Sequence, residues 1–326
     1  MRYVGYEAPG EPHVLAVAEM PVPEPGRNEV LIAVEAAGVS RADALQRRGL
    51  YPPPEGVSPV LGLEVAGTVY RVGSGVTQWQ HGDRVCALCN GGGYAEYVAV
   101  PQGQVLPIPD GWTAVEAATL PENAFTVYEN VFTRARLSPG ESILVHGGSS
   151  GIGTTAIMFA TALGSRAIAT AGSDAKYEAC LKLGASEAIN YRSTDFVDEI
   201  ARITGGNGVN VVLDIVGGDY IIRDLRCVAL DGRIACIATQ RGRVAEIDLS
   251  LLLHKRATIL GSSLRPRTPA QKAAIAAKLR ERIWPLLPVR SAIVPVVDSV
   301  YPFERAAEAH ARLESSAHIG TIVLTP

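Results

Sequence analysis

The sequence has few of the features on which membrane-spanning and nucleic-acid-binding proteins depend. The longest small and apolar stretch, 151–171, is interrupted by Gly153, Gly164 and Arg166 and is too polar to span a bilayer. The first residues include an arginine but no apolar core after it, so they do not resemble a secretory leader. The 30 basic residues face 33 acidic ones and form no dense run. We therefore expect neither a membrane partner nor a nucleic-acid partner.

Cysteine is also scarce, with five residues in 326. An odd, small number in a chain of this length does not indicate a disulfide framework, and it fits a reducing compartment such as the cytoplasm. Cys86 and Cys89 are spaced as a metal clip or redox pair would be, but a structural zinc needs four N or S ligands and the only nearby addition is His81. We expect no metal here, and a strand with one buried cysteine instead.

The pattern of predicted secondary structure changes at about residue 139. Before it, short predicted strands such as 29–37 and 67–72 are joined by glycine and proline turns. After it, apolar strand-like runs alternate with helix-length segments, which is typical of a parallel, doubly wound sheet. The sequence thus predicts an α/β protein in which a Rossmann domain (123–265) interrupts a β-rich domain (1–122 and 266–326). A long amphipathic helix is expected over 269–287, followed by strand, helix and strand.

A glycine-rich segment, 145–153, lies between the first predicted strand of the Rossmann domain and a helix. Glycines there let the backbone turn sharply and approach a pyrophosphate, whose charge the amides of the helix start can bind. The spacing departs from G-x-G-x-x-G, and a tight connection without a ligand is the alternative. The later strand ends complete the predicted site. The cofactor candidates are Ser149, Ser150, Gly151, Ile152, Gly153, Gly217, Ile237, Thr239, Ser263 and Leu264.

The tip of the second Rossmann strand indicates which dinucleotide is bound. An NAD site usually has an acidic residue there, whereas this chain has Gly172 and Ser173, followed by Lys176. A hydroxyl and an ammonium suit a 2′-phosphate, and Tyr191 at the end of the third strand can add a hydrogen bond. Asp174 would repel phosphate unless it points to solvent, and Lys176 can instead be an ordinary solvated helix residue. We expect NADPH.

The sequence resembles the medium-chain dehydrogenase/reductases, in their zinc-independent quinone oxidoreductase branch. The resemblance runs through AAGVSRADALQRRGLYPPP, LGLEVAGTVYRVGSGV, LVHGGSSGIGTTAI and SSAHIGTIVLTP. It implies a GroES-like β-domain, a Rossmann domain and a homodimer built through the Rossmann sheet edge. Zinc-dependent members take catalytic ligands from a cysteine near Ser40 and from a histidine where this chain has Leu63. The resemblance therefore implies that no catalytic metal is bound.

Without zinc, the acceptor must need little polarisation, which favours quinones and then other conjugated carbonyls. We expect NADPH-dependent quinone reduction; the alternatives are an enone, alkenal or enoyl-thioester reductase, and a non-catalytic NADPH-binding protein. The predicted acceptor-side residues are Ser40, Asp43 and Tyr51, although Asp43 can be a helix-capping carboxylate and Tyr51 a half-buried aromatic. Thr126 resembles a position that meets the nicotinamide, and is equally consistent with a structural helix threonine. Ser316 stands where some relatives have a phosphate-binding arginine, which weakens the NADPH expectation.

Overall fold

The computed structural model describes residues 1–288 and 292–326, and the chain forms two compact units. The first unit comprises Met1–Phe125, Arg265–Pro288 and Val294–Pro326. The second comprises Thr126–Leu264, with residues 292 and 293 among those described. The domain boundaries expected from the sequence lie close to these limits and stay a prediction.

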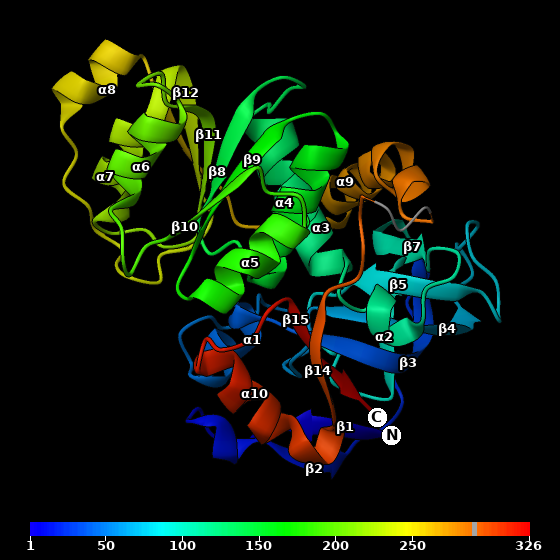
Figure 1. Cartoon of the computed structure of the whole chain (residues 1–326). Helices are drawn as coiled ribbons and strands as arrows, with labels where there is room; N and C mark the ends of the chain where they lie inside the picture. The colour runs from blue at the N-terminus through cyan, green and yellow to red at the C-terminus, as the bar shows by residue number, and fades with distance from the viewer. Residues whose placement is uncertain (289–291) are drawn as a thin grey trace. The chain divides into compact units, whose positions relative to one another are not determined.

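The second unit is built on a six-stranded sheet with the order β10-β9-β8-β11-β12-β13 (Figure 1). Every neighbouring pair in it is parallel, so the doubly wound sheet expected from the alternating pattern is confirmed. The strand order reverses between β8 and β11, which is where doubly wound sheets bind their ligands. The strands are β8 (Ser142–Val145), β9 (Arg166–Ala171), β10 (Glu187–Asn190), β11 (Val209–Asp214), β12 (Val228–Cys236) and β13 (Thr258–Gly261).

Helices cover both faces of this sheet. Figure 1 shows α4 (Gly151–Ala162) and α5 (Asp174–Lys182) on one side and α6 (Phe196–Ile203) and α7 (Tyr220–Cys227) on the other. Buried side chains of the strands pack on α6 and α7 in one apolar cluster, and each contributes about 1.5–3 kcal/mol by leaving water. A further helix of this unit is α8 (Leu249–Lys255). The last two residues of α3 (Pro121–Val127) also belong to it, and α3 continues directly into a π-helix over Tyr128–Arg134.

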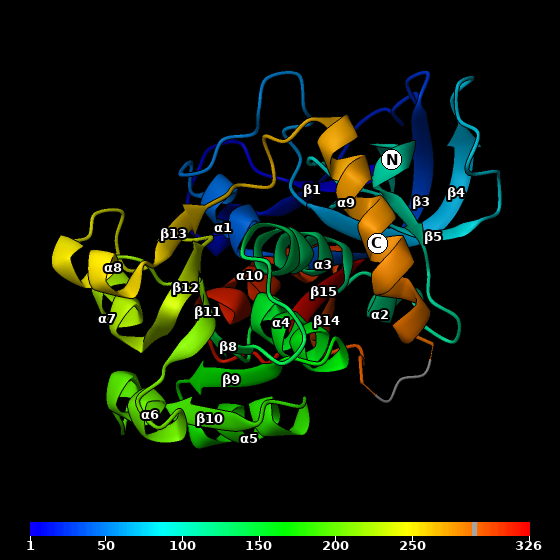
Figure 2. The ribbon, with the colours of Figure 1, turned by 90° about the horizontal axis from the view of Figure 1, so that it is seen from above.

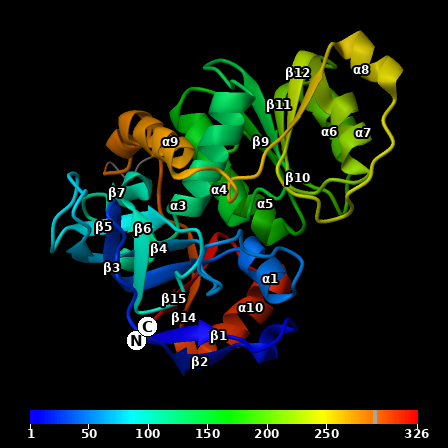
Figure 3. The same ribbon diagram turned by 180° about the vertical axis from the view of Figure 1, so that it is seen from behind.

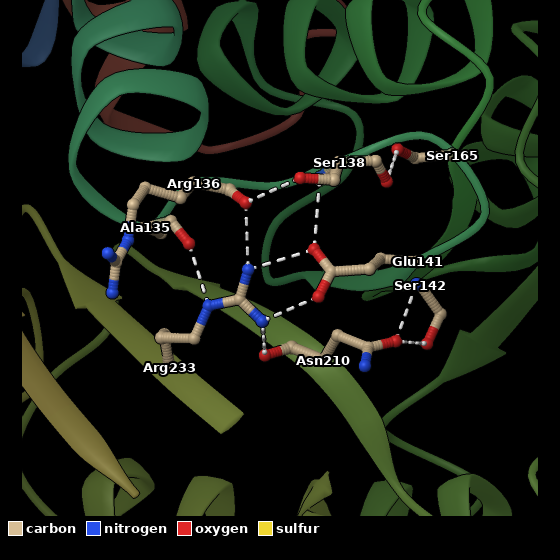
Figure 4. A network of polar contacts seen from close by, with 8 residues as sticks. All are labelled: Ala135, Arg136, Ser138, Glu141, Ser142, Ser165, Asn210 and Arg233. Atoms are coloured by element: carbon tan, nitrogen blue, oxygen red, sulfur yellow. Dashed lines mark hydrogen bonds and ion pairs between the residues drawn. The ribbon is translucent and has the colours of Figure 1, made fainter. Parts of the chain in front are cut away.

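Arg233 on β12 ties the connection that precedes β8 to the sheet (Figure 4). Its Nε donates to the Ala135 carbonyl (2.7 Å), its Nη2 donates to the Arg136 carbonyl (2.9 Å), and both Nη atoms reach the Glu141 carboxylate (2.8 Å each). The side chains are only 14% and 26% exposed. The hydrogen bonds from Arg233 hold the pKa of Glu141 below its usual range, so this carboxyl is ionised at neutral pH.

The first unit has a seven-stranded, mostly antiparallel sheet with the order β14-β15-β3-β4-β5-β7, in which β6 also pairs with β3. Its strands are β3 (Glu29–Val39), β4 (Glu64–Val72), β5 (Arg84–Leu88), β6 (Tyr97–Pro101), β7 (Val105–Pro107), β14 (Val297–Pro302) and β15 (Thr321–Thr325). A separate hairpin pairs β1 (Arg2–Gly5) with β2 (Ala16–Glu19). β3 and β4 extend beyond the short strands expected over 29–37 and 67–72.

The α-helices that lie wholly within the described part of this unit are α1 (Arg41–Arg47), α2 (Ala114–Ala117), α9 (Pro269–Arg282) and α10 (Ala306–Glu314), and residues 121–125 of α3 also belong to it. Figure 2 shows α9 as one long helix, and Figure 3 shows α10 beside β14 and β15. The helix expected over 269–287 is shorter, because Pro285 cannot donate a backbone hydrogen bond and the chain continues as a 3-10 turn. The 3-10 turns are Pro12–Val14, Gln102–Gln104, Trp284–Leu286 and Phe303–Arg305.

The two spaced cysteines need one correction. Cys86 lies in β5 as expected, but both it and Cys89 are buried, at 0% and 3% exposure, where one buried cysteine was expected. Cys89 is covered because its backbone N–H donates to the Leu63 carbonyl (2.7 Å), which folds the end of β5 against the start of β4. Burial raises the pKa of both thiols well above its ordinary value, so neither is a thiolate at neutral pH.

Two features of the described residues bear on metals and membranes. No group of three or more histidine, cysteine, aspartate or glutamate side chains within 1–288 and 292–326 is arranged to hold a metal ion. None of the helices in these ranges is both long and apolar enough to cross a bilayer. The expected lack of a metal and of a membrane partner stays a prediction.

Candidate nucleotide and acceptor sites

The glycine loop of the second unit connects β8 to α4. Ser150 caps α4: its hydroxyl accepts from the Gly153 N–H (3.0 Å) and donates to the Gly147 carbonyl (2.8 Å). Gly147 has a φ of 65°, and a Cβ on Gly153 would lie 2.2 Å from the Gly147 oxygen. The loop is therefore closed so tightly that side chains are excluded at these glycines.

This geometry fits a dinucleotide. The first amides of a 12-residue helix have no acceptor within the helix, and Ser150 satisfies only the Gly153 N–H. The Gly151 and Ile152 amides therefore remain for a pyrophosphate, with the positive end of the helix dipole behind them. Ser149 precedes the cap in the same loop. The structure thus brings the five loop candidates, 149–153, together at the carboxyl end of β8.

The tip of β9 carries the candidates for the 2′-phosphate. Ser173 caps α5 by accepting from the Lys176 N–H (3.4 Å), so both lie at the first turn of that helix. A Cβ on Gly172 would lie 2.4 Å from the Tyr191 hydroxyl, which places these two residues side by side. Asp174, which would repel a phosphate, instead accepts from the Asn190 amide (2.8 Å). The carboxylate is therefore engaged by a donor on β10, the strand next to β9.

A second group of candidates meets at the ends of β11 and β12. Asp214 accepts from the backbone N–H of Val216 (2.6 Å) and Gly217 (3.1 Å), and its own carbonyl accepts from Ile237 (2.9 Å). Gly217 pairs with Gly242, whose N–H donates to the Thr239 carbonyl (3.2 Å). Gly217, Ile237 and Thr239 thus share one turn system. Ser263 and Leu264 follow the adjacent strand β13, and Thr126 lies half-buried on α3.

In the first unit, Ser40 and Asp43 form the start of α1. The Asp43 carboxylate accepts from the Ser40 N–H (2.9 Å), the Ser40 hydroxyl (2.8 Å) and the Gly62 N–H (2.8 Å). This is a capping box, the alternative that the sequence left open for Asp43. Both side chains are buried, and burial raises the pKa of Asp43 despite its donors. Their role at the acceptor stays a prediction.

Tyr51 is held by a residue that the sequence did not single out. The Arg265 guanidinium lies 5.4 Å from the centre of the Tyr51 ring and donates to the Gln46 side-chain oxygen (2.7 Å) and the Asn90 carbonyl (3.1 Å). Lys272 donates to the Arg265 carbonyl (3.0 Å) and to the Asn90 side chain. Burial, followed by the charge of Arg265, lowers the pKa of Lys272 to about 8. Two buried cations therefore position the segment that carries Tyr51.

Two further acids lie near Asp43. Glu64, on β4, is 1% exposed and accepts from the Glu122 backbone N–H (2.9 Å), while Glu122 itself is half-buried. Burial and then the charge of Glu122 raise the pKa of Glu64 well above its usual value. Burial, followed by the charge of Asp43, raises the pKa of Glu122 to about 7. The sequence singles out the nearby Leu63 and Thr126 but not these two acids. Their burial in the folded structure is what identifies them.

Comparisons with known proteins agree with this architecture. The model of the alcohol dehydrogenase GroES-like domain matches 26–110, and that of the zinc-binding dehydrogenase domain matches 151–278. Rat quinone oxidoreductase is 32% identical over 97% of this chain and 94% of its own length. The crystal structure of Escherichia coli quinone oxidoreductase complexed with NADPH superposes with a TM-score of 0.86 at 32% identity, covering all of both chains.

A third comparison bears on the choice of substrate. The CurK enoyl reductase superposes with a TM-score of 0.86 at 27% identity, covering 99% of this chain and 98% of its own. The predicted α/β architecture of a Rossmann unit and a GroES-like unit is confirmed by these matches together with the observed sheets. The chain therefore belongs to the quinone oxidoreductase branch of the medium-chain dehydrogenase/reductase family.

Proposed function

We propose that this protein transfers a hydride from NADPH to quinones without a catalytic zinc. One observation carries the proposal: the glycine loop is intact, while the zinc-ligand positions of the zinc-dependent relatives hold groups that do not fit the metal. Ser40 has its hydroxyl engaged in the α1 cap, and Leu63 is an apolar side chain that is 5% exposed. Borderline-soft zinc prefers thiolate, imidazole and carboxylate ligands, so neither residue is suited to it.

NADPH would supply the hydride, and the protein would bind, orient and shield it. The Gly151 and Ile152 amides would hold the pyrophosphate, and Ser173, Lys176 and Tyr191 would hold the 2′-phosphate. The turn formed by Gly217, Ile237 and Thr239 lies at the neighbouring strand ends, where it would contact the rest of the cofactor. Thr126, Ser263 and Leu264 complete the proposed cofactor set.

The first unit would bind the acceptor and provide a proton. Tyr51 offers a flat ring for stacking and a hydroxyl for a carbonyl oxygen, and Arg265 fixes its ring. Ser40 and Asp43 hold the start of α1, and they remain proposed acceptor-side residues. Glu122 is the strongest candidate for the proton source, because its half-buried carboxyl has a pKa of about 7 and can both hold and release a proton near neutral pH.

Replacing Tyr51 by phenylalanine tests the acceptor side. We expect kcat/KM for quinones to fall about tenfold, because one hydrogen bond to the carbonyl is lost, while NADPH affinity stays unchanged. The measurement is steady-state NADPH oxidation against a panel of quinones and enones. Tyr70→Phe, at a 44% exposed tyrosine of the same unit, is the matched control. No turnover of any quinone or enone by the wild-type protein would reject the proposed function.

Glu122→Gln tests the proton source. A raised pKa keeps the Glu122 carboxyl protonated below about pH 7, so activity that depends on its proton should decline as pH rises through that value. The glutamine variant should lose this inflection and retain about a tenth of the activity at pH 6. The kcat–pH profile measures it, with Glu308→Gln, an exposed acid of α10, as the control. An unchanged inflection in Glu122→Gln would assign the proton to another group.

Reduction of an enoyl thioester or enone is the second candidate. It is favoured by the likeness to the CurK enoyl reductase, and the same hydride donor serves both reactions. A saturated carbonyl product formed faster than any hydroquinone would select it. Binding of NADPH with no oxidation by either class of acceptor would instead indicate a non-catalytic protein.

The oligomer and its location are also proposals. We infer a homodimer through β13, an outer strand of the Rossmann sheet; α8, which packs on the neighbouring strand β12, has Leu249 and Leu253 64% and 74% exposed. Unpaired strand edges and apolar patches are typical association surfaces. Sedimentation should give twice the 34.4 kDa chain mass, and a monomer at micromolar concentration would contradict it. All five cysteines are free thiols, which supports a reducing, cytoplasmic setting.

A further inference from the structure

A buried polar chain lies beneath the glycine loop, and no step of the proposed reaction uses it. His146 is the first residue after β8, and its imidazole is completely buried. The ring Nε2 lies 2.8 Å from Oδ1 of Asp224 on α7, which is also completely buried. The ring Nδ1 lies 3.1 Å from the hydroxyl of Thr170 on β9. Each group comes from a different element of the second unit.

The contacts from Asp224 through His146 to Thr170 extend to the nucleotide loop. The Thr170 hydroxyl accepts from the backbone N–H of Gly147 (3.3 Å), the residue whose positive φ begins the turn. Thr170 also anchors the next residue, because its carbonyl accepts from the Gly148 N–H (2.9 Å). Two consecutive backbone amides of the loop therefore donate to one threonine, and the hydroxyl of that threonine contacts His146, which in turn contacts Asp224.

Asp224 hydrogen-bonds through one oxygen. Its Oδ2 has no hydrogen-bond partner among the residues that the structure describes, so the hydrogen bond that its carboxylate makes there is the one to His146. A carboxylate acceptor requires a proton on Nε2, in the neutral and in the protonated imidazole alike, and this directs Nδ1 toward Thr170. Phe196 and Tyr220 pack edge-on against the imidazole, with centroids 4.8 and 4.9 Å away, and prevent it from rotating.

The same cluster adjoins the second group of cofactor candidates. Asp214, whose carboxylate holds the Gly217 N–H, interacts electrostatically with both His146 and Asp224. The charge of Asp224 raises the pKa of Asp214, after the larger effect of burial, and His146 opposes it. His146 thus contacts one acid, Asp224, and interacts electrostatically with a second, Asp214, whose carboxylate holds the Gly217 turn.

We propose that Asp224, His146 and Thr170 are positioning residues that preorganise the Gly147–Gly148 turn for the pyrophosphate of NADPH. The inference rests on the proposed NADPH binding and specifies how this chain holds its loop. Fixing the loop before binding removes an ordering cost that the ligand would otherwise meet. A core histidine with satisfied polar atoms would stabilise the fold equally well, but it would not alter cofactor affinity in the folded protein.

Thr170→Val separates these two roles, because valine has nearly the same shape and lacks only the hydroxyl. We expect NADPH affinity to fall about tenfold, kcat at saturating NADPH to stay within about twofold, and Thr170→Ser to restore the affinity. NADPH binding is measured directly by fluorescence titration without an acceptor. Thr161→Val, at an exposed threonine of α4, is the matched control.

A wild-type Kd in a folded Thr170→Val variant would overturn the inference while leaving the proposed function intact. Tight NADPH binding without quinone turnover by the wild type would do the reverse. If Thr170→Val does not fold, ¹⁵N-histidine spectra of the wild type decide. We expect the His146 nitrogen shifts to move on saturation with NADP⁺, and no movement would contradict the link between this pair and the loop.

Discussion

Gly153→Ala should weaken NADPH binding by about 100-fold, which corresponds to about 2.8 kcal/mol. An added Cβ would lie 2.2 Å from the Gly147 carbonyl oxygen and 2.6 Å from the Gly148 Cα, and both neighbours are backbone atoms. The first turn of α4 would have to move away from the loop, which displaces the amides proposed to bind the pyrophosphate. Titration of NADPH fluorescence measures the loss.

Gly261→Ala is the matched control for this substitution. Gly261 lies in β13 of the same unit, and an added Cβ there would meet its nearest atom, the Cys236 carbonyl oxygen, at an ordinary 3.8 Å. We expect that variant to bind NADPH as the wild type does. If Gly153→Ala also keeps wild-type affinity while folded, the pyrophosphate does not lie at the glycine loop.

Arg233→Met should lower the free energy of unfolding by about 3 kcal/mol. Methionine keeps much of the side-chain volume but leaves the Glu141 carboxylate without its cation and the Ala135 and Arg136 carbonyls without a donor (Figure 4). All three acceptors belong to the connection before β8, so the loss falls on the strand that carries the nucleotide loop. Equilibrium urea unfolding measures it.

A double-mutant cycle with Glu141→Gln shows where this energy resides. The glutamine substitution already removes the charge that Arg233 neutralises. The double variant should therefore lose less stability than the sum of the two single losses. Arg233→Lys should recover only part of the stability, since an ammonium cannot reach the carboxylate and two carbonyls in one planar fork. Strict additivity in the cycle would mean that the carbonyl contacts, and not the ion pair, dominate.

The Rossmann unit was predictable because its signals are local. Each apolar run that became a central strand, such as β8 and β11, is four to six residues long and is followed by glycine or a turn. The glycine loop between β8 and α4 was read from nine consecutive residues, and its closed geometry follows from the glycines themselves. Asp43 shows the limit of this reasoning, since the same S-x-x-D spacing serves equally for a helix cap and for a cleft residue.

The groups that the sequence did not reveal meet across long separations in the chain. Arg265 is 219 residues from Gln46, and His146 is 78 residues from Asp224. No periodicity or spacing records such pairs, because the fold alone brings them together. The near-neutral pKa of Glu122 has the same origin, because burial and the charge of Asp43 raise it. The residues next to Glu122 in the sequence indicate neither effect.

Hydride transfer in metal-depleted protein tests the central claim most directly. The protein is treated with a chelator, shown by elemental analysis to lack zinc, and assayed with NADPH deuterated at C4 and a quinone. We predict full turnover with a primary isotope effect, because neither Ser40 nor Leu63 is suited to hold a catalytic metal. Loss of turnover on chelation, restored by stoichiometric zinc, would contradict the claim.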